Sequence, residues 1–194
     1  MKWLYENWPK ATIFTAIYIM TLLILFVMKT DYALFLIWAQ MCIYLLHQFE
    51  EYIFPGGFKE YFNIHMLNSK NDQEPLCKAV AFWINVPVVF IAYPVTAILA
   101  QFIGIGVGMW TAYFSIINAA GHVGMAIKDR GYNPGFVVSL FGNIPFGIYT
   151  VWYLNSHASV SVTANIAGLV IGLLIQGTVM FYGFAILRPR ILRS

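Results

Sequence analysis

Residues 45–57 read Leu45-Leu46-His47-Gln48-Phe49-Glu50-Glu51-Tyr52-Ile53-Phe54-Pro55-Gly56-Gly57 and close a long apolar run. His47, Glu50 and Glu51 share one face of the predicted helix, because positions i, i+3 and i+4 lie close together on its surface. Ionisable side chains inside an apolar span are costly and mark functional sites by default. We therefore take this cluster as the candidate site and the rest of the chain as its scaffold.

The composition is that of a membrane protein. Of the 194 residues, 60% are hydrophobic and only 10% are charged, whereas a soluble domain has about 25% charged residues. The apolar segments are evenly spread without a long polar linker, which predicts a single transmembrane domain over residues 1–194. The chain has no basic cluster interleaved with aromatic residues, so we expect the lipid bilayer and not a nucleic acid as its partner.

The hydropathy pattern predicts an all-α integral membrane bundle of about six transmembrane helices. Each predicted helix has close to the ~20 residues that a bilayer requires. The predicted helices cover residues 11–28, 32–54, 76–100, 102–127, 136–154 and 160–187. Residues 58–68 are too short and too polar to span, so we expect one short interfacial helix after the second span.

Lysine and arginine set the expected orientation. With six spans both termini lie on one side of the membrane, and that side holds ten of the eleven Lys and Arg residues. These ten are Lys2, Lys10, Lys59, Lys70, Lys78, Lys128, Arg130, Arg188, Arg190 and Arg193. The other side holds only Lys29. The positive-inside rule therefore predicts a cytosolic N-terminus and a cytosolic C-terminus.

Polar residues are expected to converge in the cytosolic third of the membrane. At a rise of ~1.5 Å per residue, five of the predicted helices each place a polar side chain at this depth. These residues are His47, Glu51, Asn85, Asn118, His122, Asn143 and Gln176. Polar groups in hydrocarbon need partners, so one shared pocket is predicted. The prolines of Asn85-Val86-Pro87 and Asn143-Ile144-Pro145 are expected to open their helices nearby.

A divalent metal is the predicted cofactor of this pocket. Imidazole and carboxylate ligands suit Zn²⁺, Fe²⁺ or Mn²⁺ with positions left open for water or substrate. We predict that His47, Glu51 and His122 are the ligands. His65, just after the Gly56-Gly57 hinge, is a further candidate ligand, and His157 is expected on the other side of the membrane and outside the site.

The predicted catalytic residues are Glu50, Glu51 and Asn118. The side chains of adjacent residues diverge by ~100°, so only one glutamate faces His47 squarely. Both glutamates are candidates for taking a proton. The glutamate that does not face His47 is expected to bind a neighbouring helix or a basic group such as Lys128 or Arg130. Asn118 lies one turn before His122, where its amide can hold a substrate carbonyl or an oxyanion.

Together, His47-x-x-Glu50-Glu51, Asn118-x-x-x-His122 and Tyr132-Asn133-Pro134-Gly135 resemble the family named for its HXXEE motif. The resemblance runs from about the second helix to the fifth. It implies a small, multi-pass membrane protein with a metal or catalytic role. Because the family is mostly bacterial, it also implies a location in a bacterial plasma membrane. It supplies no reaction.

A looser similarity, in residue types only, connects the chain with the CAAX-type intramembrane proteases. Those enzymes pair a Glu-Glu motif with histidines and a His/Asn pair. Pro55 stands here where they carry an arginine, and Asn118 precedes His122 in this chain.

Three functions fit these patterns. The first is a metal-dependent, hydrolase-like membrane enzyme that acts on a lipophilic small molecule. The second is a small transporter or ion-binding protein whose carboxylates take protons or cations. The third is a structural protein whose polar cluster locks the bundle. If Glu51→Gln loses activity but keeps its fold, the protein is an enzyme. Coupled ion flux would indicate the transporter. Lower thermal stability when a member of the cluster is removed would indicate the structural role.

Overall fold

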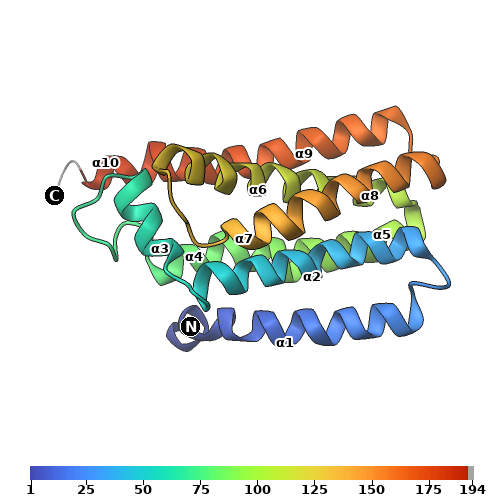
Figure 1. Ribbon diagram of the computed structural model, residues 1–194, viewed down its shortest axis with the longest axis horizontal. Helices are drawn as coiled ribbons and strands as arrows, with labels where there is room; N and C mark the ends of the chain where they lie inside the picture. Colours follow the sequence, from blue (N-terminus) through green and yellow to red (C-terminus); the bar gives the residue numbers. More distant parts are fainter. Residues whose placement is uncertain (192–194) are drawn as a thin grey trace.

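A computed structural model describes residues 1–191, and all of the regular elements in this range are helices (Figure 1). Three of the long helices are continuous α-helices: α1 (Lys2–Phe26), α2 (Tyr32–Tyr52) and α6 (Met109–Asp129). Three more spans are composite, each joining α-helix to a π-helical stretch. They are α4 (Lys78–Val86), Pro87–Ala92 and α5 (Tyr93–Ile103); α7 (Phe136–Val138), Ser139–Asn143 and α8 (Ile144–His157); and α9 (Val162–Phe181), Tyr182–Leu187 and α10 (Arg188–Ile191).

Five of these helices are long and apolar enough to cross a membrane, which confirms the all-helical membrane class. They are Lys2–Phe26, Tyr32–Tyr52, Lys78–Ile103, Phe136–His157 and Val162–Leu187. The remaining predicted span corresponds to α6, which has 21 residues and lies among the others (Figure 1). It contacts α2, α8 and α9, and its polar residues Thr111, Ser115 and His122 are buried.

The predicted boundaries hold best around α2. Asp31 accepts a hydrogen bond from the Leu34 amide at 2.9 Å and caps the helix start, as aspartate commonly does. The helix ends shortly before Gly56 and Gly57, which have φ of +74° and +90° and therefore suit glycine. The chain reverses there into the predicted short helix, α3 (Phe58–Tyr61) with its π-helical continuation Phe62–Met66.

Proline accounts for the π-helical stretches in the composite spans. Each of the three ends two residues before a proline, namely Pro94, Pro145 and Pro189. The residue just before each proline donates its amide to the carbonyl five residues earlier, as Ile144 does to Ser139. Proline has no N–H to continue the regular ladder, so the helix widens at this point. The opening expected near Pro145 is therefore confirmed.

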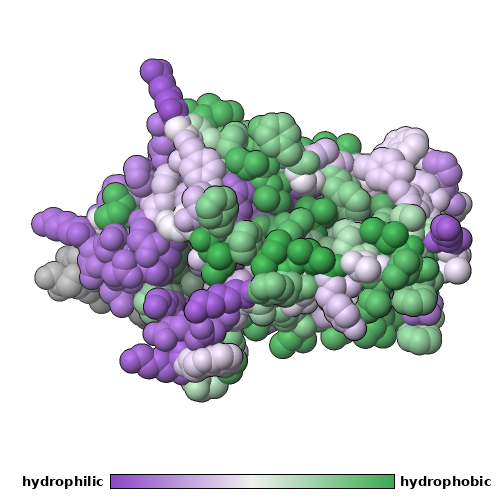
Figure 2. All heavy atoms as spheres, turned by 60° about the horizontal axis from the view of Figure 1, so that its bottom comes forward, coloured by the Kyte–Doolittle hydropathy of each residue, from purple (hydrophilic) through white to green (hydrophobic). Residues whose placement is uncertain are grey.

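Charged and apolar surfaces are segregated along the bundle. Hydrophilic side chains gather at the end that holds α3 and the start of α1, and hydrophobic side chains cover the middle (Figures 1 and 2). Outward-facing residues such as Phe14, Ile17 and Leu174 are 74%, 58% and 63% exposed, as lipid-facing side chains are. Lys29 lies in the turn at the opposite end (Figure 1). Arg193, one of the residues used for orientation, lies outside the described range.

Glycines allow α9 to pack closely on α6. A Cβ added at Gly168 would lie 2.8 Å from Met109 Cβ, whereas one at Gly177 on the same helix would meet nothing within 4 Å. We expect Gly168→Ala to destabilise the protein by about 1–3 kcal/mol through overpacking. Gly177→Ala should be neutral or stabilising by up to ~1 kcal/mol. Thermal unfolding of both variants in one detergent tests this, and equal midpoints would contradict the packing argument.

Candidate metal centre

Two helices bring the predicted ligands together at the charged end of the bundle. His47 and Glu51 lie one turn apart on α2, and His122 comes from the C-terminal half of α6. Glu51 Oε1 lies 3.5 Å from His47 Nε2 and 3.2 Å from His122 Nε2. All three side chains are buried, and each offers one ligand atom within 4.8 Å of the others.

The Nδ1 atom of each imidazole lies within hydrogen-bond distance of an acceptor. His47 Nδ1 lies 3.2 Å from the Gly135 carbonyl oxygen and 3.3 Å from Ser139 Oγ. His122 Nδ1 lies 2.8 Å from Asn133 Oδ1. Asn133 Nδ2 donates to the His122 carbonyl at 2.9 Å, so the amide orientation is determined and Oδ1 must face the ring. Both Nδ1 atoms are therefore the protonated nitrogens.

This tautomer leaves three lone-pair donors facing one another. With Nδ1 protonated, neutral His47 and His122 each present an Nε2 lone pair to the Glu51 carboxylate. His47 Nε2 has no hydrogen-bond partner among residues 1–191. Lone pairs that converge at such distances repel unless a cation, either a metal ion or a proton, lies between them. Metal-binding histidines are oriented in the same way, by an acceptor on the second ring nitrogen.

Gly135 closes the site from the loop between α6 and α7. Its φ is +94°, and a Cβ there would lie 2.7 Å from His47 Cε1 and 2.8 Å from His122 Cε1. The same Cβ would lie 3.0 Å from Glu51 Cγ. Only glycine combines this backbone conformation with so close an approach to all three ligands.

Glu50 points to a different part of the structure. Its Oε1 accepts hydrogen bonds from Tyr132 OH and the Val137 amide, both at 2.9 Å, and its Oε2 accepts from the Val138 amide at 2.6 Å. Val137 and Val138 are in the first turn of α7, so Glu50 caps that helix from α2. Of the two partners expected for this glutamate, the neighbouring helix is confirmed as α7, and these donors bind Glu50 in place of Lys128 or Arg130. Partial burial raises the pKa of Tyr132, and the hydrogen bond to Glu50 raises it further. Tyr132 therefore keeps its proton and remains a hydrogen-bond donor.

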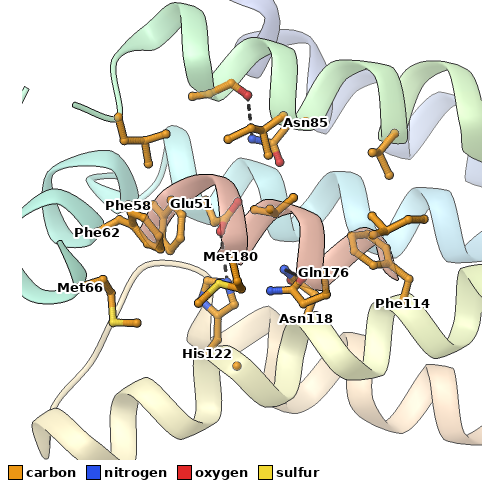
Figure 3. A pocket seen from close by; sticks show the side chains of 18 of the residues that line it. Glu51, Phe58, Phe62, Met66, Asn85, Phe114, Asn118, His122, Gln176 and Met180 are labelled. Carbon is orange, nitrogen blue, oxygen red and sulfur yellow. Dashed lines mark hydrogen bonds and ion pairs between the residues drawn. The ribbon is translucent and has the colours of Figure 1, made fainter. Parts of the chain in front are cut away.

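A cavity of about 310 Å³ opens from Glu51 and His122 (Figure 3). Its polar lining also includes Asn85, Asn118 and Gln176, so the predicted shared pocket is confirmed for five of its seven residues, and His47 and Asn143 do not line it. Asn118 Nδ2 donates to Gln176 Oε1 at 3.3 Å. The remaining lining is apolar, with Phe58, Phe62, Met66, Phe114 and Met180 among the residues shown in Figure 3.

Three polar residues lie elsewhere. His65 does not join the ligands: it is half exposed, and its Nδ1 lies 3.5 Å from Asp129 Oδ2. The candidate ligand role of His65 is wrong in this structure, because the helix at Phe62–Met66 directs it outward to α6. Asn143 is buried but does not line the cavity, and neither of its amide atoms has a partner in the described chain. His157 stacks on Tyr153 at the opposite end, as expected.

The residues around the ligands were missed as site residues. Asn133 and Gly135 belong to the loop motif that carries the family resemblance, but helical spacing does not predict their contacts with His122 and His47. Ser139 was not singled out. Gln48 donates to Glu51 Oε2 at 2.7 Å, and its spacing of three residues from Glu51 was the available signal.

Comparison with known proteins identifies the family. No curated protein and no solved structure matches the chain, so the looser similarity to CAAX-type proteases gains no support. A family model described as "protein of unknown function with HXXEE motif" matches residues 38–150, which is more than half of the chain. The match includes His47, Glu50, Glu51 and His122 and the loop that holds them. The chain therefore belongs to the HXXEE-motif family.

Proposed function

We propose that this protein is a membrane-embedded, metal-dependent hydrolase whose ion is held by His47, Glu51 and His122. The observation that carries the proposal is the convergence of two Nε2 lone pairs and one carboxylate in a buried site that opens on an apolar cavity. Two histidines and one carboxylate form a common catalytic zinc set, and the set also suits Fe²⁺ or Mn²⁺.

Hydrolysis is the reaction that such a site supports best. Three protein ligands would leave a coordination position open on a bound zinc ion, and such an ion would activate water for attack on the carbonyl carbon of an ester or amide. In the net reaction the water oxygen would bond to the carbonyl carbon, the bond to the alcohol or amine would break, and the departing group would take a proton from the water. Asn118 lines the same cavity and gives one of its two amide hydrogens to Gln176, so the second is left to donate to the carbonyl oxygen.

Glu50 is a positioning residue in this proposal. Its carboxylate oxygens are engaged by Tyr132 and by the amides at the start of α7. The loop so anchored carries Asn133 and Gly135, which orient the two histidines. The role predicted for Glu50 in proton transfer is not supported by this geometry, and Glu51 is the carboxylate at the reacting centre.

The expected membrane orientation places the site on the cytosolic side. The end of the bundle near the site holds Lys59, Lys70, Lys128 and Arg130, and the opposite end holds Lys29. By the positive-inside rule the charged end faces the cytosol. The bacterial plasma membrane stays a prediction from the family resemblance.

Elemental analysis of the protein purified in mild detergent is the direct test of the metal site. We expect close to one zinc, iron or manganese ion per chain, and loss of this ion in His47→Ala and His122→Ala. His65→Ala, which removes an imidazole outside the site, is the matched control and should keep the ion. A metal-free wild type with a normal unfolding midpoint, purified without chelators and offered each ion, would refute the proposal.

Proton-coupled transport is the second candidate, and one observation favours it. Gln40 Oε1 and both amide atoms of Asn143 are buried without partners among the described residues. Gln40 lies two turns from His47 on α2, toward the end with Lys29, and Asn143 lies one turn from Ser139. These groups extend the polar region beyond the ligands. The test is proton flux into vesicles that contain metal-free protein. Flux that is present with the wild type and lost in His47→Ala would favour this candidate.

A further inference from the structure

A second, larger hollow leads from the bilayer-facing surface to the cavity beside the candidate metal centre. It has a volume of about 600 Å³ and lies between α4, with its π-helical continuation, and the C-terminal half of α9. Its walls are apolar and include Ala79, Trp83, Leu174 and Thr178. We call this hollow the lateral groove.

The lateral groove and the cavity share a threshold. Ile84 and Val88 from one wall, and Ile175 and Val179 from the other, line both spaces. In the described chain α9 packs along α6, and α4 packs along α1, so these two walls are not joined by close helix packing. Both walls belong to segments that are long and apolar enough to span a membrane. The groove therefore opens toward hydrocarbon and not toward water.

The cavity also presents an unsatisfied polar atom. Asn118 Oδ1 is buried and has no hydrogen-bond partner in residues 1–191, while Asn118 Nδ2 is already bonded to Gln176. A buried acceptor without a donor is costly, so a ligand with an N–H or O–H group would stabilise this position. Asn118 lines the same cavity as Glu51 and His122, the candidate ligand residues (Figure 3).

We infer that the lateral groove admits the single hydrocarbon chain of a membrane amphiphile, whose amide or hydroxyl group donates to Asn118 next to the metal centre. This inference rests on the proposed function and names its substrate class and its route of entry. The hydrocarbon chain of the amphiphile lies among Trp83, Leu174 and the threshold residues. Its polar end passes between Val88 and Val179. A substrate bound in this way leaves the bilayer sideways without exposing its chain to water.

Photolabelling in lipid nanodiscs tests the inference with a defined probe. The probe is a sixteen-carbon fatty amide with a diazirine in mid-chain, and its methyl ester, which has no N–H donor, is the comparison compound. We expect saturable labelling of the groove walls by the amide, competed by unlabelled amide, and weaker saturable labelling by the ester. Asn118→Leu should remove the difference between the two compounds.

Two tryptophan variants on α9 provide a matched pair. Val179→Trp fills the threshold, and saturable labelling should fall roughly tenfold or more because the added ring occupies the passage. Val170→Trp places the same side chain at a position that is 46% exposed and outside the groove, and should label like the wild type. If Val179→Trp fails to fold, Val88→Phe narrows the passage from the opposite wall.

The metal content of the same samples separates this inference from the proposed function. Metal-loaded protein with labelling spread over all lipid-facing helices, or unchanged by Val179→Trp, would overturn the lateral groove and leave the metal centre. Saturable labelling of the groove in protein that stays metal-free after each ion is offered would retain the groove as a lipid site and overturn the metal-dependent hydrolase.

Discussion

Glu51→Gln should abolish metal binding while the protein keeps its fold. The substitution removes the only carboxylate of the ligand set but preserves its shape. Loss of an outer-shell partner typically weakens metal affinity 10–100-fold, and loss of a ligand should exceed this. Metal content of the purified variant and its affinity for added Zn²⁺ are the measurements.

The unfolding midpoint of Glu51→Gln gives this prediction its discriminating power. The glutamine oxygen can still accept from Gln48 Nε2, as Glu51 Oε2 does at 2.7 Å. Its NH₂ group would then face the Nε2 atoms of His47 and His122 and donate to their lone pairs. We therefore expect metal-free Glu51→Gln to unfold at the same temperature as metal-free wild type or higher. A lower midpoint with unchanged metal content would favour a purely structural cluster.

Glu50→Gln is the matched control, because it makes the same change one residue earlier. Glu50 accepts hydrogen bonds from two backbone amides at the start of α7 and from Tyr132 OH in the preceding loop. An amide retains one acceptor atom and places an N–H₂ group against a backbone N–H, which should cost about 1–3 kcal/mol. The ion should remain bound, with affinity reduced by roughly 10–100-fold at most through the displaced loop. Metal loss in Glu50→Gln with retention in Glu51→Gln would reverse the assigned roles.

Gly135→Ala is expected to be the most damaging single-methyl change in the loop. A positive φ at a residue with a Cβ costs roughly 1–2 kcal/mol, and the methyl group would press on His47, His122 and Glu51 together. Overpacking of this kind adds typically 1–3 kcal/mol. Relief requires the loop to move away, which withdraws the acceptors of the imidazole N–H groups. We expect both a lower unfolding midpoint and loss of the bound ion.

Gly131→Ala in the same loop controls for the change of residue type. A Cβ at Gly131 would meet only the Asp129 carbonyl oxygen, at 3.7 Å, and its backbone is not in the left-handed region. Its effect should stay within about 0.5 kcal/mol, as for ordinary surface changes. Equal behaviour of the two variants, in unfolding midpoint and metal content, would contradict the close approach of Gly135 to the ligands.

Much of the scaffold could be predicted because lipid imposes simple requirements on sequence. Every spanning segment must be a helix of sufficient length, so apolar runs separated by Lys29-Thr30-Asp31 or Pro55-Gly56-Gly57 predicted helix ends within a few residues. The start of α6 was placed at Phe102, seven residues too early. Gly104, with φ of +140°, follows the end of α5 at Ile103, and a 3₁₀ turn at Ile105–Gly108 precedes α6.

The candidate ligands were also accessible from sequence, since ionisable residues are rare in apolar spans and therefore conspicuous. His47 and Glu51 share a helix face by their spacing of four residues alone. The addition of His122 needed an estimate of depth, which the regular rise of a helix supplies. The same estimate included Asn143, which is buried but does not line the cavity.

Residue patterns alone predict the helical membrane class, the helix that carries His47 and Glu51, and the shared polar layer. The packing of the helices is needed to establish which glutamate faces the histidines, which nitrogen of each imidazole is held, and that Gly135 closes the site. Helical periodicity is a local property, so it reports which residues share a face. Tautomers, loop contacts and the lateral groove depend on atoms from α2, α4, α6, α7 and α9 meeting in space, and no local pattern records those meetings.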